Sequence, residues 1–286
     1  MNILSSIRHY LKNTDLYLMG LALACSVFGM LLIYSATLNP VTALDGSTKN
    51  LYVQGAAIVL GLAAFVALSL LDLENVSEMW RAFVIGNILL QFLLFTPLGT
   101  EINGQRAWLN LGITSLQPGE LGKLIFIFTI AAHMMEIRDH ITEWRGVFSV
   151  GLHTLVMMGA VVVPSGDSGM AIQYLMIAAI MIFSAGLPLK WLGIAAGAGI
   201  ASVPILWNFV FNDYQKTRIL VLFDPSIDVD TSRQATYGKI AIGSGRFAGE
   251  GLTHGTMTQM QYVPENQTDY IFSVAGEELG FLGCML

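Results

Sequence analysis

Long apolar runs recur along the chain, and short polar segments separate them. Each run is roughly 20 residues long, enough for a helix to cross the hydrocarbon core of a bilayer, which is about 30 Å thick. An eighth run begins near residue 270. We predict the other spanning helices at about 16–37, 51–71, 80–98, 116–135, 146–163, 168–187 and 189–211. The fold class is therefore an all-α polytopic membrane protein.

Composition supports this prediction. Hydrophobic residues make up 54% of the 286 residues and charged residues only 12%, against about 25% charged in soluble domains. The net charge of −6 and the lack of a basic tract give no indication of a nucleic-acid partner. Cys25 and Cys284 both fall in apolar runs, so a disulfide framework is not expected. With no internal repeat or linker, we expect one domain, 1–286.

Basic residues in the short loops predict the orientation. With the N-terminus inside, the outer loops hold only Lys49 and Arg106. The inner segments then hold Arg8, Lys12, Arg81, Arg138, Arg145 and Lys190. The N-terminus is therefore expected in the cytoplasm, and the large loop 212–269 outside. The last run is short and ends without a polar tail, so we expect the full-length protein to continue beyond residue 286.

The loop before the fourth helix holds Arg106 and Trp108, and Pro118 suits the first turn of that helix. Glu120 and Lys123 are three residues apart inside the apolar segment, so they share a helix face. The two side chains could form a self-neutralising pair that stabilises the bundle. Alternatively, they line a polar cavity with a function, because ionisable groups are expensive inside a membrane.

The outer turn VPSGDSG contains Asp167, which is either the N-cap of the sixth helix or a functional acid. The large loop 212–269 is too long to be a simple connector, and its apolar stretches RILVLF and KIAIGSG are expected to form short helices. Its Lys216 and Arg218 are available for anionic groups. The glycines of GSGRFAGEG either form a phosphate-binding loop or serve backbone turns. Without GK[ST], no nucleotide is predicted.

Asp269 lies where the large loop meets the last apolar run, and Glu277 and Glu278 lie inside that run. A carboxylate partly withdrawn from water can have a raised proton affinity and serve as a base. The alternative is an N-cap on the last helix, for which Thr268 is an equal candidate. His133, Glu136 and His140 could share a helix face, but their spacing matches no standard metal motif.

Several segments resemble the SEDS (shape, elongation, division and sporulation) family of RodA, FtsW and SpoVE. The resemblance covers nearly the whole chain. It rests on YSAT at 34–37, GQRAWLNLGITSLQPGELGKL, QKTRILVLFDP and the long stretch KIAIGSGRFAGEGLTHGTMTQMQYVPENQTDYIFSVAGEELGFLG. The chain departs from the family pattern at Gly119, where QPSE becomes QPGE, at Ser168 in DSG and at Arg246 in IGSGR. It also has QTDY where the family has HTDF.

This resemblance implies a ten-helix fold with a large outer loop between helices seven and eight. It implies a peptidoglycan glycosyltransferase that polymerises lipid II beside a class B penicillin-binding protein, in cell elongation, division or sporulation. The family's essential loop aspartate falls on Asp269, the expected catalytic base. The expected substrate-binding residues are Arg106, Trp108, Glu120, Lys123, Asp167, Arg218 and Glu265.

A divalent cation, Mg²⁺ or Mn²⁺, could help to hold the diphosphate of lipid II, since metals commonly bind diphosphates. The sequence leaves the metal ligands unknown. Two other functions stay open. A lipid II flippase would also use buried Glu120, Lys123 and Asp167. A non-catalytic scaffold of the cell-wall machinery would tolerate the loss of these charges.

Overall fold

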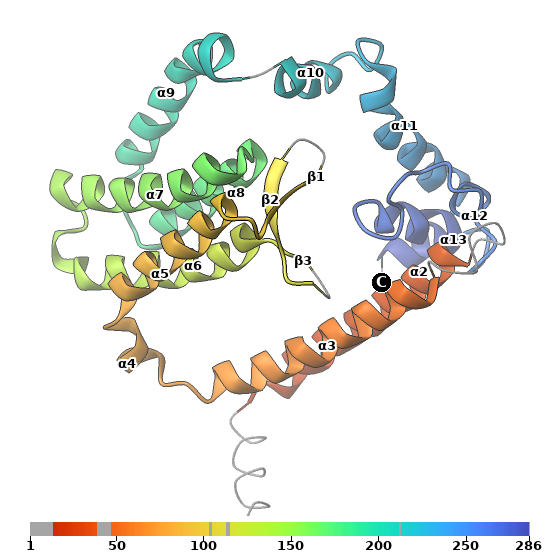
Figure 1. Cartoon of the computed structure of the whole chain (residues 1–286), viewed down its shortest axis with the longest axis horizontal. Helices are drawn as coiled ribbons and strands as arrows, with labels where there is room; N and C mark the ends of the chain where they lie inside the picture. Colours follow the sequence, from red (N-terminus) through yellow and green to blue (C-terminus); the bar gives the residue numbers. More distant parts are fainter. Residues whose placement is uncertain (1–13, 39–46, 103–104, 113–114, 212, 286) are drawn as a thin grey trace, which may run out of the picture. The chain divides into compact units, whose positions relative to one another are not determined.

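The structure, a computed structural model, describes residues 14–38, 47–102, 105–112, 115–211 and 213–285 (Figure 1). The basic residues Arg8 and Lys12, on which the orientation partly rests, lie outside these ranges. The chain divides into two compact units. Unit 1 combines Met1–Leu70 with Trp207–Leu286, and unit 2 is Leu71–Leu206. The expectation of one domain stays a prediction.

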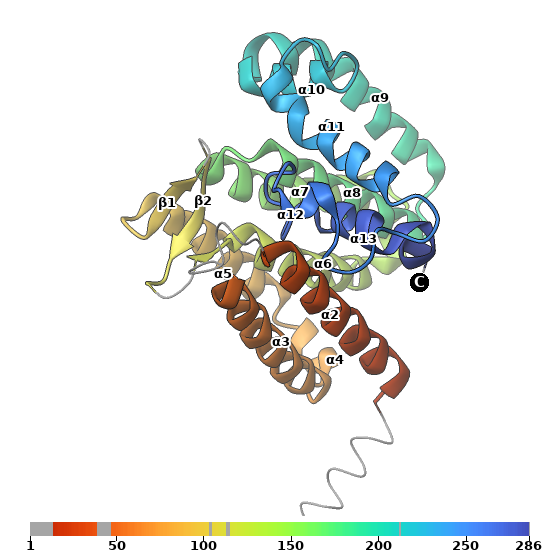
Figure 2. The ribbon, with the colours of Figure 1, turned by 90° about the vertical axis from the view of Figure 1, so that its right-hand side faces the viewer.

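Unit 1 begins with two long apolar helices, α2 (Leu16–Thr37) and α3 (Ser47–Ser69), which lie side by side (Figures 1 and 2). Asp15 caps α2, since its carboxylate accepts a hydrogen bond from the Leu18 amide at 3.0 Å. Large apolar side chains are exposed along both helices, as expected for surfaces that face lipid. Both are long and apolar enough to cross a membrane.

The second part of unit 1 holds α10 (Asp213–Val221), α11 (Val229–Ser244), α12 (Thr256–Gln259) and α13 (Ile271–Met285). The first two confirm the short helices expected in the large loop. The last apolar run, predicted to begin near residue 270, forms α13 but is not a continuous helix. Gly280 has φ +65° and ψ −166°, so α13 is interrupted there. Val274 and Ala275 of α13 pack on Leu32 and Ala36 of α2.

Unit 2 is a helix bundle that begins with the short helix α4 (Leu73–Ser77). Its main helices are α5 (Trp80–Phe92), α6 (Pro118–Glu136), α7 (Trp144–Ser165), α8 (Ser168–Ser184) and α9 (Leu189–Ile205). Three single-turn elements accompany them: η1 (Leu93–Phe95), η2 (Arg138–His140) and the π-turn η3 (Leu206–Val210), which runs into unit 1. The bundle core centres on Phe126, whose ring stacks on Tyr174 at 5.1 Å.

The tight turn between the fifth and sixth predicted spans is real. α7 ends at Ser165, Gly166 adopts the left-handed φ of +68°, and Asp167 starts α8 at once. Left-handed backbone is inexpensive for glycine, so the chain can reverse within two residues. All seven predicted spans therefore correspond to helices, with ends that differ by a few residues. The α6 and α7 spans match Pro118–Glu136 and Trp144–Ser165.

A small antiparallel sheet, which the hydrophobic pattern did not predict, precedes α6. It has the order β1 (Gly99–Ile102), β2 (Gln105–Asn110) and β3 (Ser115–Leu116). Leu109 of β2 pairs with Gly99 on one side and Leu116 on the other. The sheet ends at Leu116, and after the N-cap residue Gln117 the helix α6 begins at Pro118.

Candidate functional site

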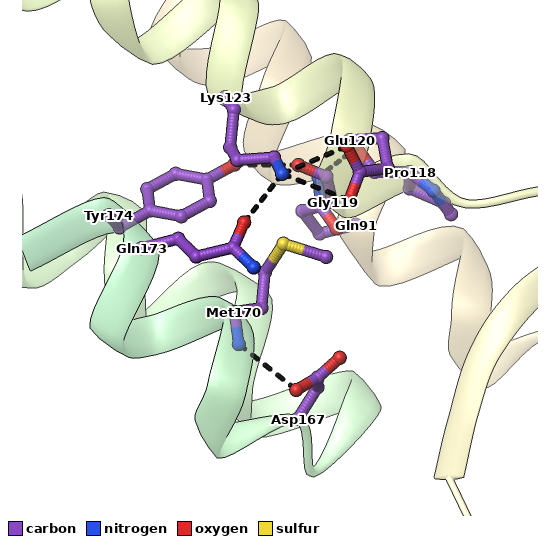
Figure 3. A network of polar contacts seen from close by, with 9 residues as sticks. All are labelled: Gln91, Pro118, Gly119, Glu120, Lys123, Asp167, Met170, Gln173 and Tyr174. Atoms are coloured by element: carbon purple, nitrogen blue, oxygen red, sulfur yellow. Dashed lines mark hydrogen bonds and ion pairs between the residues drawn. The ribbon is translucent and has the colours of Figure 1, made fainter. Parts of the chain in front are cut away.

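Lys123 is a charged residue near the start of α6 and is held by two side chains (Figure 3). Its ammonium lies 2.9 Å from each carboxylate oxygen of Glu120 and donates to the Gln173 Oε1 of α8 at 2.6 Å. The Lys123 side chain is only 19% exposed, whereas that of Glu120 is 55% exposed. The predicted Glu120–Lys123 pair therefore exists. Gln173 was missed, because a neutral amide in an apolar run gives no charge signal.

The first turn of α6 is braced by polar side chains from its neighbours. Buried Gln91 of α5 donates to the Pro118 carbonyl at 2.9 Å, and the Tyr174 hydroxyl of α8 donates to the Gly119 carbonyl at 3.2 Å (Figure 3). A Cβ atom at Gly122 would lie 2.7 Å from Gln91 Nε2 and even closer to the Tyr174 hydroxyl. Because Gly122 has no side chain, α5, α6 and α8 can pack closely one residue before Lys123.

Asp167 caps α8 with one oxygen only. Its Oδ1 accepts the Met170 amide at 3.0 Å, and among the described residues Oδ2 accepts no hydrogen bond. The N-cap alternative is therefore correct, yet it leaves half of the carboxylate available. Asp167 also borders a small recess. Its lining residues are Gln91, Leu94, Ala107, Gln117, Gly119, Val161, Ser165, Asp167 and Met170.

Arg106 and Trp108 both lie on β2, two residues apart. The Arg106 guanidinium is exposed and donates to the Thr96 carbonyl at 2.9 Å. Trp108 is half-buried and pairs with Thr100 of β1. The alternation of a strand places these two side chains on the same face of the sheet. The sheet thus presents one cation and one aromatic ring together.

Asp269, the predicted base, is exposed in the turn just before α13. Within the described part of the chain its carboxylate accepts no hydrogen bond and forms no ion pair, so it does not cap the helix. The preceding turn is built on Glu265, which has a left-handed φ of +54°. The Glu265 carbonyl accepts the amides of Thr268 at 3.1 Å and Tyr270 at 3.3 Å.

Glu277 and Glu278 are buried, at 0% and 1% exposure, and both have structural partners in unit 1. Glu277 accepts the Met257 amide at 2.6 Å, the Thr258 amide at 2.9 Å and the Thr258 hydroxyl at 2.6 Å. Glu278 accepts the hydroxyl of Ser35 in α2 at 2.6 Å. These hydrogen bonds connect α13 to α12 of the large loop and to α2, which explains why two carboxylates lie in the apolar run.

The glycines of GSGRFAGEG serve close backbone contact. A Cβ atom at Gly245 would overlap the Gly276 carbonyl, and one at Gly249 would overlap the Glu278 carbonyl. The amides of Glu250 and Gly251, which a phosphate loop would present to a ligand, donate to α13 carbonyls at 2.9 Å. The structure therefore favours the alternative of backbone turns over a phosphate-binding loop.

Arg246 replaces a glycine of the family pattern, and its φ of +50° explains why glycine suits that position. Arg218, the remaining cation of the predicted site, is exposed in the last turn of α10.

His133, Glu136 and His140 do not meet. His133 lies 3.1 Å from His153 of α7, between their Nδ1 atoms, while Glu136 binds Arg81 at 2.6 Å. The His140 ring, in the exposed turn after α6, lies 2.8 Å from Glu143. This hydrogen bond to a carboxylate raises the pKa of His140 above its ordinary value of 6.5.

The helices and these polar groups define a class of protein: a multi-pass helical membrane protein with a lysine–carboxylate pair at the start of one helix and a large loop fastened by buried carboxylates. The chain belongs to the FtsW/RodA/SpoVE family of cell cycle proteins, whose family model matches residues 15–286.

Similar proteins of known identity agree with this membership. The chain is 29% identical over 265 residues to the peptidoglycan glycosyltransferase MrdB of Escherichia coli K12, covering 92% of this chain and 69% of that protein. It is 31% identical over 288 residues to a probable peptidoglycan glycosyltransferase FtsW of Nitrosomonas europaea, covering 96% of this chain and 69% of that protein.

Solved structures share the fold. A chain from a peptidoglycan synthase complex that coordinates polymerization and crosslinking matches with a TM-score of 0.73 and 27% identity, covering 96% of this chain and 73% of that one. The rod shape determining protein RodA of Thermus thermophilus matches with a TM-score of 0.62 at 24% identity, covering 96% of this chain and 70% of that chain.

Proposed function

We propose that this chain is a peptidoglycan glycosyltransferase that polymerises lipid II into glycan strands. The observation that carries the proposal is family membership over residues 15–286, together with relatives that are named as this enzyme. Two features of the site support it: an exposed acid that has no structural partner in the described chain, and a lysine that two side chains hold in place.

The reaction joins two lipid II molecules. The 4-hydroxyl oxygen of one sugar attacks C1 of the other, and the hydroxyl proton goes to a base. The bond between C1 and the diphosphate oxygen breaks, and the undecaprenyl diphosphate leaves with that electron pair. Attack opposite to the leaving group inverts C1 and gives a β-1,4 link. The chemistry therefore needs one base and positive charge for the diphosphate.

Asp269 is the proposed base, because it is an exposed carboxylate whose oxygens are not used by the described fold. Lys123 is the proposed partner of the diphosphate, with Arg106 and Arg218 as further cations. Trp108 presents an aromatic face for a sugar, and Glu265 shapes the turn that carries Asp269.

A Mg²⁺ or Mn²⁺ ion is proposed to share the diphosphate with Asp167 and Glu120; because no group of three or more His, Cys, Asp or Glu residues lies together in the described chain, substrate phosphates and water would complete its ligands. Magnesium is usually bound by one or two carboxylates together with substrate phosphates. Asp167 offers Oδ2, the oxygen that it does not use in capping α8, and Glu120 offers a half-exposed carboxylate. Such an ion would neutralise charge on the leaving diphosphate.

The protein crosses the membrane several times. We place the N-terminus in the cytoplasm of a bacterium and the large loop 212–269 outside, in line with the basic residues of the short loops. A class B penicillin-binding protein is the proposed partner, since a similar structure belongs to a peptidoglycan synthase complex.

The test is glycan synthesis by purified protein from lipid II, with the partner present. Asp269→Asn is expected to lower the rate by about 10²- to 10⁴-fold, the typical contribution of general base catalysis. Asp213→Asn, an exposed aspartate at the start of α10, is the matched control. Retention of most of the wild-type rate by Asp269→Asn would remove Asp269 as the base. Movement of labelled lipid II across vesicles without any polymer would instead favour a flippase.

A further inference from the structure

The Lys123 ammonium donates hydrogen bonds to Glu120 Oε1 and Gln173 Oε1 and forms an ion pair with Glu120 Oε2. A lysine ammonium has three donors. Both Glu120 oxygens lie at 2.9 Å and Gln173 Oε1 lies at 2.6 Å. A phosphate oxygen that approaches Lys123 therefore competes with these two side chains for the ammonium. The two candidates, Glu120 and Gln173, are both exposed, but they differ in charge and in attachment.

Glu120 is the acceptor that can leave. Its side chain is 55% exposed, so water can replace Lys123 as its partner. It is also negatively charged, so an incoming phosphate repels it while attracting Lys123. Glu120 and Lys123 lie on the same helix, and their separation there does not depend on any other element.

Gln173 is the acceptor that stays. It is neutral, so a phosphate does not repel it. It belongs to α8, and the neighbouring Tyr174 ties α8 to the first turn of α6 through the Gly119 carbonyl. Met170, one turn earlier on α8, also contacts this turn, since a Cβ atom at Gly119 would lie 3.0 Å from its Cε (Figure 3).

We infer that Gln173 is a positioning residue for Lys123. It holds the ammonium in place while Glu120 exchanges for the diphosphate of the substrate. The inference rests on the proposed function, because a diphosphate substrate is what makes the exchange useful. The amide is suited to this task since it adds an acceptor without adding a charge. A carboxylate at position 173 would instead hold Lys123 in a site with two negative charges.

The first experiment measures the Lys123 amine itself and needs no catalysis. Purified protein in detergent is labelled with an acylating reagent across pH, and modification of Lys123 is followed by mass spectrometry. Gln173→Leu removes one of the acceptors that hold the amine and is expected to speed labelling by about tenfold. Gln173→Glu is expected to slow it. Gln54→Leu on α3, which has no described side-chain partner, is the control.

The second experiment measures lipid II polymerisation by the same variants. Gln173→Leu is expected to lower kcat by about tenfold, because the Lys123 ammonium is no longer held in position. Gln173→Glu is expected to raise KM, because its carboxylate competes with the diphosphate. Gln173→Asn, which keeps an amide on a shorter side chain, is expected to retain more activity than Gln173→Leu.

The two readouts separate the hypotheses. If wild-type protein makes no polymer, the proposed function fails, and labelling alone decides whether Gln173 holds Lys123. If the wild type makes polymer while Gln173→Leu labels and polymerises like Gln54→Leu, the inference is overturned. Should Gln173→Leu fail to fold, Gln173→Glu decides: unchanged Lys123 labelling and unchanged KM overturn it.

Discussion

Replacing Glu277 by glutamine changes one oxygen of a buried carboxylate to an amino group and leaves the volume almost unchanged. The carboxylate accepts three hydrogen bonds from two residues of α12, at 2.6, 2.9 and 2.6 Å. An amide has only one oxygen, so at least one buried amide or hydroxyl donor would face another donor. Two of these bonds are with oxygen Oε2 and one with Oε1, so no orientation of glutamine satisfies all three.

The expected cost follows from these bonds. A hydrogen bond to a charged group contributes about 1.5–3 kcal/mol, and an unsatisfied buried donor costs about 1–3 kcal/mol. Losing at least one bond and its charge should therefore destabilise the fastened loop by about 3 kcal/mol. Since about 1.4 kcal/mol is a factor of ten, the detached loop should become about 100-fold more populated.

Limited proteolysis of the loop 245–270 under native conditions measures this population. Glu250→Gln is the matched control, because Glu250 also accepts two bonds at the start of α12, from Thr256 at 3.1 and 3.2 Å, but is exposed. We expect its cleavage rate to change by less than about fivefold, since exposed groups exchange their partners with water. Equal cleavage of the two variants would refute the role assigned to Glu277.

Two further predictions follow from unit 2. Gly122→Ala should lower stability by about 2 kcal/mol, a typical cost of overpacking, because the new methyl group would meet the Tyr174 hydroxyl. Thermal unfolding should show this loss and no loss for Gly151→Ala, where nothing lies within 4 Å. His140 should titrate above pH 6.5 by NMR, and Glu143→Gln should return it toward 6.5. The contact with Glu143 favours protonated His140. Its contribution to the free energy of unfolding is therefore full below pH 6.5 and is lost as the pH rises through the raised pKa.

The spanning helices could be predicted because their signal is local. Runs such as 16–37 are apolar throughout, and length alone identifies them. The sheet of β1 to β3 could not be found in this way. Its strands have two to six residues, and their pairing depends on the helix ends on either side. The interruption of α13 at Gly280 depends on the loop backbone that contacts it, which is distant in sequence.

The site was predictable where charge marked it. Glu120 and Lys123 stand out in an apolar run, and their spacing gave the pair that the structure has. Gln173 is neutral and does not stand out in the sequence. Only the packing of α6 on α8 brings it next to Lys123. Glu277 carries the same charge as Asp269, yet one has buried partners and the other has none in the described chain. Composition alone cannot separate these two cases.

The glycine segment meets α13 through main-chain atoms. The Phe281 amide donates to the Arg246 carbonyl at 3.0 Å, and the Leu282 amide to the Phe247 carbonyl at 3.2 Å. Peptide groups are the same in every residue, so this seam holds its geometry whatever side chains point outward from it. Outward-facing side chains of this segment can therefore be substituted without moving Asp269, which lies just before α13. An arginine can replace a glycine in such a seam, at the cost of local backbone strain alone.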